Sequence, residues 1–100
     1  MRIEFINREN GPKNLLSEAE IHFEDSIDSD ALTGLKLVGF TLWKTEKGDI
    51  TVTVPSRSWG EPGERKFFDL LRAGDGGPES VRRLKAAIIA AYEAQKAATR

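Results

Sequence analysis

The sequence contains no cysteine, and this absence excludes disulfides and thiolate-bound metal sites. It also fits a reducing compartment, so we expect a cytoplasmic protein. The only histidine, His22, lies between Glu20 and Glu24 in the sequence, and no credible Ser/His/Asp nucleophilic site includes it. The glycines around Gly76 lack the lysine and the spacing of a phosphate-binding loop. We therefore expect a non-enzyme without cofactor, metal or small-molecule substrate.

Long apolar runs are absent as well. No stretch approaches the roughly 20 apolar residues that a membrane-spanning helix needs. The N-terminal segment lacks the apolar run of a signal peptide. A length of 100 residues is close to the commonest domain size, and no internal repeat divides the chain. We expect one domain over residues 1–100 and no association with a membrane.

The charges are nearly balanced in total but are divided unevenly along the chain. The net charge is −1, which argues against a strongly basic nucleic-acid-binding protein. Residues 1–55 contain six Lys/Arg and ten Asp/Glu, whereas residues 56–100 contain nine Lys/Arg and six Asp/Glu. An asymmetry of this size marks a binding face in some proteins and arises by chance in other short chains.

Residues 35–57 predict the central element, a β-hairpin. Its two strands are separated by residues 46–48, a three-residue loop in which Gly48 takes the left-handed conformation. The register that follows pairs Lys44 with Ile50, Leu42 with Val52, and Phe40 with Val54. Val38 is expected on the same core face as Phe40 and Leu42. Turn chemistry and apolar pattern select the same register, and this agreement fixes the hairpin.

The reverse face of the first hairpin strand is also partly apolar, since it carries Leu35, Leu37 and Trp43. One helix cannot cover both faces of the sheet. A helix, another strand or another subunit must therefore cover the second face, and we expect the other subunit of a homodimer.

Two further strands precede the hairpin. Alternating apolar residues predict strands over residues 1–5 and 15–24, and the second strand has an acidic outer face. Residues 25–30 form an acidic connection. On the outer face, Glu20, His22 and Glu24 could touch a metal, but further ligands are lacking. We interpret this face as solvated.

The second half of the chain predicts a loop, a short strand and a helix. Pro55 ends the hairpin strand because it has no N–H for the ladder. Residues 56–64 are expected as a loop and residues 65–72 as a short strand. Pro78 opens a helix, and the helix has an apolar stripe at helical spacing: Val81, Leu84, Ile88, Ala91 and Tyr92. The fold class is therefore α+β, a small antiparallel sheet around a central hairpin with a C-terminal helix.

Basic residues of the second half are the candidates for nucleic-acid contact. Guanidinium and ammonium groups suit phosphate, and the candidate set is Arg57, Arg65, Lys66, Arg82 and Arg83. Trp59 lies among them, where its side chain either stacks on a base or caps the core. The alternative for the charges is that they only keep the protein in solution.

Several segments resemble a known bacterial family. They are residues 19–25 (AEIHFED), 35–38 (LKLV), 50–57 (ITVTVPSR), 68–70 (FDL) and 86–93 (AAIIAAYE). In this order and with these spacings, the chain resembles the SpoVG (stage V sporulation protein G) family. The resemblance departs from the family pattern at Ser58, where a second basic residue is common, and after Leu70, where an HP pair is missing.

The resemblance implies a small antiparallel sheet with a C-terminal helix, a homodimer, and a cytoplasmic regulator that binds DNA or RNA. Of the basic candidates, only Arg57 matches a family motif; the others rest on charge and position. An alternative hypothesis is a non-enzymatic protein-interaction or assembly module that has the same fold without nucleic-acid binding.

Overall fold

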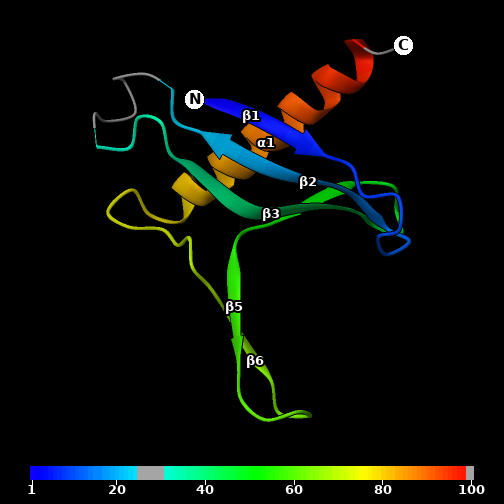
Figure 1. Ribbon diagram of the computed structural model, residues 1–100, viewed down its shortest axis with the longest axis vertical. Helices are drawn as coiled ribbons and strands as arrows, with labels where there is room; N and C mark the ends of the chain where they lie inside the picture. Colours follow the sequence, from blue (N-terminus) through cyan, green and yellow to red (C-terminus); the bar gives the residue numbers. More distant parts are fainter. Residues whose placement is uncertain (25–30, 99–100) are drawn as a thin grey trace.

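The computed structural model describes residues 1–24 and 31–98, so the acidic connection expected at residues 25–30 lies outside the described residues. The fold is α+β, as the sequence predicts. Along the chain (Figure 1) the elements are β1 (Arg2–Ile6), β2 (Leu15–His22), β3 (Lys36–Lys44), β4 (Ile50–Thr53), β5 (Ser56–Trp59), β6 (Lys66–Asp69) and α1 (Pro78–Ala98).

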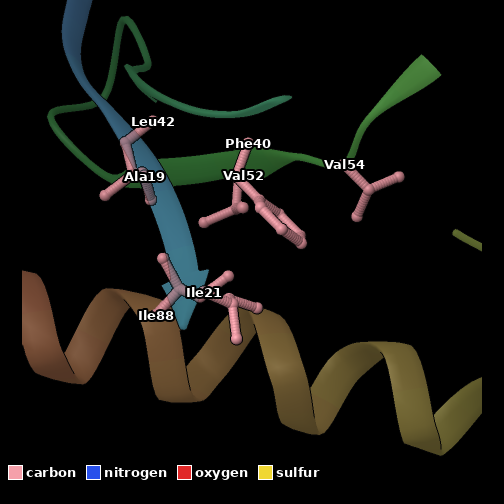
Figure 2. Close-up of a cluster of buried hydrophobic side chains, with 7 residues drawn as sticks. All are labelled: Ala19, Ile21, Phe40, Leu42, Val52, Val54 and Ile88. Carbon is pink, nitrogen blue, oxygen red and sulfur yellow. The ribbon is translucent and has the colours of Figure 1, made fainter. Parts of the chain in front are cut away.

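The first four strands form one antiparallel sheet in the order β1-β2-β3-β4, and α1 packs across one face of it (Figure 1). Figure 2 shows the buried cluster between sheet and helix: Ala19, Ile21, Phe40, Leu42, Val52, Val54 and Ile88. Phe5 of β1 and Tyr92 of α1 extend this core through an edge-to-face ring contact with centroids 5.4 Å apart. Among the described residues, no helix is both long and apolar enough to cross a membrane.

The central hairpin has two of the three pairs that the sequence predicts, and the paired region ends at Thr41 and Thr53, before Phe40 and Val54. Lys44 pairs with Ile50 and Leu42 with Val52. The N–H of Thr45 donates to the carbonyl oxygen of Asp49 at 2.8 Å, which closes the three-residue loop, and Gly48 has a φ of 90°.

The predicted core position of Val38 is wrong, because β3 contains a bulge. Ala19 pairs with Phe40 and Ile21 with Leu37, so two residues of β3 lie opposite one residue of β2. Gly39 is one of the two and adopts a φ of 107°. The extra residue reverses the alternation, so Leu37 packs against the core while Val38 is 50% exposed. Leu37 is therefore not on the reverse face.

The strands β5 and β6 form a separate two-stranded antiparallel sheet, here called the ribbon (residues 56–69). Figure 1 shows it extending away from the main sheet and α1. The radius of gyration is 15.0 Å, above the about 13 Å of a compact domain of this length. The expectation of a loop over residues 56–64 is thus wrong at its start, since Ser56–Trp59 form β5.

Candidate nucleic-acid interface

The ribbon has two different faces, which follow from its register. Residues directly opposite each other in an antiparallel pair point to the same side. Arg57 pairs with Phe68 and Trp59 pairs with Lys66, so these four side chains share one side. We call this side the basic aromatic face. The other side carries Ser56, Ser58, Phe67 and Asp69.

The aromatic rings of the basic aromatic face are accessible to a partner. Trp59 is 52% exposed and Phe68 is 38% exposed. Trp59 therefore does not cap the core. Lys66 Nζ lies 5.3 Å from the centroid of the Trp59 ring, a cation–π contact that holds the ammonium over the indole.

The basic side chains of the ribbon are also accessible to a partner. Within residues 1–24 and 31–98, neither Arg57 nor Lys66 forms an ion pair, and the same is true of Arg65, which immediately precedes β6. All three residues are exposed. A guanidinium or ammonium group in this condition can bind a phosphate without first losing a carboxylate partner.

The other two candidates belong to a different element. Arg82 and Arg83 are exposed residues near the start of α1, and Arg82 already pairs with Glu79 on the same helix. The structure therefore groups Arg57, Arg65 and Lys66 on the ribbon. It does not place the five candidates on a single element.

The sequence did not predict the position of Phe68 beside Arg57. With residues 56–64 expected as a loop, Arg57 and Trp59 had no strand partner, so nothing placed Phe68 beside them. The signal that was available is the alternation of serine with arginine and tryptophan from Ser56 to Trp59, which has the period of a strand.

A second cluster of polar residues lies on the outer face of the main sheet. His22 Nε2 is 2.6 Å from Glu4 Oε2 and 3.4 Å from Glu20 Oε1, without the alignment of a hydrogen bond. The ligand atoms of these three residues lie within 4.8 Å of one another, a grouping that could hold a metal ion. However, Arg2 approaches Glu4 at 3.0 Å and Lys36 approaches Glu20 at 3.3 Å. These cations balance the carboxylates, so we interpret the cluster as an ion-pair network.

The second carboxylate of this cluster is Glu4, whereas the sequence suggested Glu24. The register of β1 against β2 places Glu4 opposite Glu20. Glu24 instead accepts a hydrogen bond from Arg2, and this bond raises the pKa of Arg2 above its ordinary value. The prediction from sequence considered residues of β2 alone and lacked the pairing of β2 with β1.

Comparison of the chain with protein-family models, with curated proteins and with solved structures found no match.

Proposed function

We propose that the chain binds nucleic acid through the basic aromatic face of the ribbon, as a cytoplasmic regulator of the SpoVG-like kind. The observation that carries this proposal is the shared face of Arg57, Trp59, Lys66 and Phe68, which combines two cations with two exposed rings. Alternating positive charge and aromatic surface is typical of proteins that bind nucleic-acid strands. The α+β fold with a C-terminal helix also agrees with the fold that the SpoVG resemblance implies.

The position of Arg57 supports the proposal further. Pro55 is buried, and its carbonyl oxygen accepts a hydrogen bond from the N–H of Leu70 at 2.8 Å. The two ends of the ribbon are therefore joined at a buried residue two positions before Arg57. A phosphate contact at this position would be held by the fold, and such contacts orient the ligand without reading its sequence.

We expect the salt dependence of binding to identify the charges that contact phosphate. For duplex DNA, the log–log slope of affinity against salt changes by about 0.9 for each phosphate neutralised. The double variant Arg57→Ala/Lys66→Ala should make the log–log slope shallower by up to about 0.9 for each of the two removed charges. Thermal stability should be unchanged, because both residues are exposed. Fluorescence anisotropy at several salt concentrations measures the slope.

The matched control is Arg82→Ala/Arg83→Ala, which removes the same number of charges from α1. If the helix variant flattens the slope and the ribbon variant does not, the interface lies on α1. If the wild-type protein binds neither DNA nor RNA at low salt, the proposal is wrong.

A second candidate function is a non-enzymatic protein-interaction or assembly module without nucleic-acid binding, here tested through the homodimer that we expect with either function. The favouring observation is the amount of exposed apolar surface, since Phe67 is 70% exposed and Leu70 is 58% exposed. Surface of this kind is often covered by another chain.

For this second candidate we expect a mass of two chains in light scattering at micromolar concentration. Replacement of Phe67 and Leu70 by serine should shift the protein toward the monomer, because the apolar contact area is lost. A wild-type monomer at that concentration would contradict the homodimer.

A further inference from the structure

We infer that the ligand of the ribbon is an unpaired nucleic-acid strand, with one base stacked on Trp59. This inference rests on the proposed function and adds the class of ligand and the mode of contact. In a duplex, the flat surfaces of the bases are covered by their neighbours, so only an unstacked base can present its ring to an indole.

The basic aromatic face offers ring surface for stacking and has no amide side chain to read an adenine edge. The ribbon contains neither asparagine nor glutamine, the amides that pair with adenine in a duplex groove. The accessible groups of the basic aromatic face are the rings of Trp59 and Phe68 and the cations Arg57 and Lys66. Rings stack on any base, so the expected preference is for single strands of varied sequence.

The arrangement along the ribbon matches an extended strand. Arg57 and Trp59 are two residues apart on β5, which corresponds to about 7 Å along a strand. A strand that runs parallel to β5 would therefore place a phosphate at Arg57 and a base at Trp59. The register puts Phe68 beside Arg57 on the same face, where it offers a second ring.

Lys66 has a specific part in this arrangement. Its ammonium lies over the Trp59 ring at 5.3 Å from the centroid. A base that stacks on this side of the indole displaces the ammonium, which then remains close enough to meet the phosphate of the same nucleotide. The cation–π contact thus keeps the ring and the charge in place before the ligand arrives.

The test compares a 15-nucleotide single strand with a hairpin duplex of the same composition. We expect tighter binding of the single strand. Trp59→Ala should weaken that binding by about 5- to 150-fold, the equivalent of about 1–3 kcal/mol for one stacked base. Trp59→Phe should retain most of the affinity. Lys66→Ala should instead reduce the salt slope by about 0.7, the value for one phosphate of a single strand.

Phe67→Ala is the matched control, because Phe67 belongs to the same ribbon and is more exposed than Trp59, but points to the other face. It should leave affinity unchanged. Equal losses from Phe67→Ala and Trp59→Ala would overturn the stacking mode, and equal or tighter duplex binding would overturn the ligand class. In both cases the proposed function stands. Failure to bind either ligand at low salt overturns the proposed function and this inference together.

The fluorescence of Trp59 gives a reading that does not depend on a truncated variant. The chain has two tryptophans, so the Trp43→Phe variant reports Trp59 alone. Stacking should quench the fluorescence of Trp59, and the quenching should reach a plateau as the single strand is added. An unchanged signal while anisotropy shows binding would contradict the inference.

Discussion

Replacement of Phe40 by alanine should lower the free energy of unfolding by about 3–5 kcal/mol. The Phe40 side chain is fully buried, with an exposed fraction of 0%, and lies in the cluster that joins β2, β3 and β4 to α1. The loss combines the transfer of the ring to water with the cavity that remains between sheet and helix. Urea unfolding followed by circular dichroism measures this difference.

Phe67→Ala provides the control for this prediction, since it makes the same chemical change at a side chain that is 70% exposed. Substitutions at such positions change stability by about 0.5 kcal/mol or less. A loss below about 1 kcal/mol for Phe40→Ala would show that the core lies on the other face of the hairpin.

Removal of the whole ribbon should abolish nucleic-acid binding and leave the rest of the protein folded. The hydrogen bond between Leu70 and Pro55 shows that the chain enters and leaves the ribbon at neighbouring points. Residues 56–69 can therefore be replaced by a short Asn-Gly turn without stretching the backbone. None of the seven residues of the buried cluster is lost.

We expect the shortened protein to unfold cooperatively, with a stability within about 1 kcal/mol of the intact chain, because an isolated two-stranded hairpin contributes little. Its binding should fall to the background of the assay. Circular dichroism and anisotropy give the two readings. If the shortened protein still binds, the interface lies on the main sheet or α1. Arg82 and Arg83 are then the leading candidates.

The parts of the fold that the sequence predicts well are those in which local pattern and tertiary packing agree. The hairpin register follows from Gly48 and from the apolar residues on either side of it, and both signals act within a few positions. The stripe around Ile88 predicts the buried face of α1 in the same way.

The errors arise where the deciding partner is distant in the sequence. The bulge at Gly39 depends on the pairing of β3 with β2, and the only local signal of it within β3 is the glycine itself. The position of Glu4 beside His22 depends on the pairing of β1 with β2. The residues of the candidate site were predicted one by one, Arg57 from a family motif and the others from charge and position. Their division between the ribbon and α1 required the three-dimensional arrangement.

The projection of the ribbon from the main sheet has a consequence for how this protein can change in evolution. Residues that hold the fold together and residues proposed to contact the ligand occupy separate parts of the chain. A mutation at Trp59 or Lys66 can therefore change the preference for a ligand without lowering the stability of the core around Phe40 and Ile88. Selection can accordingly tune affinity and stability independently.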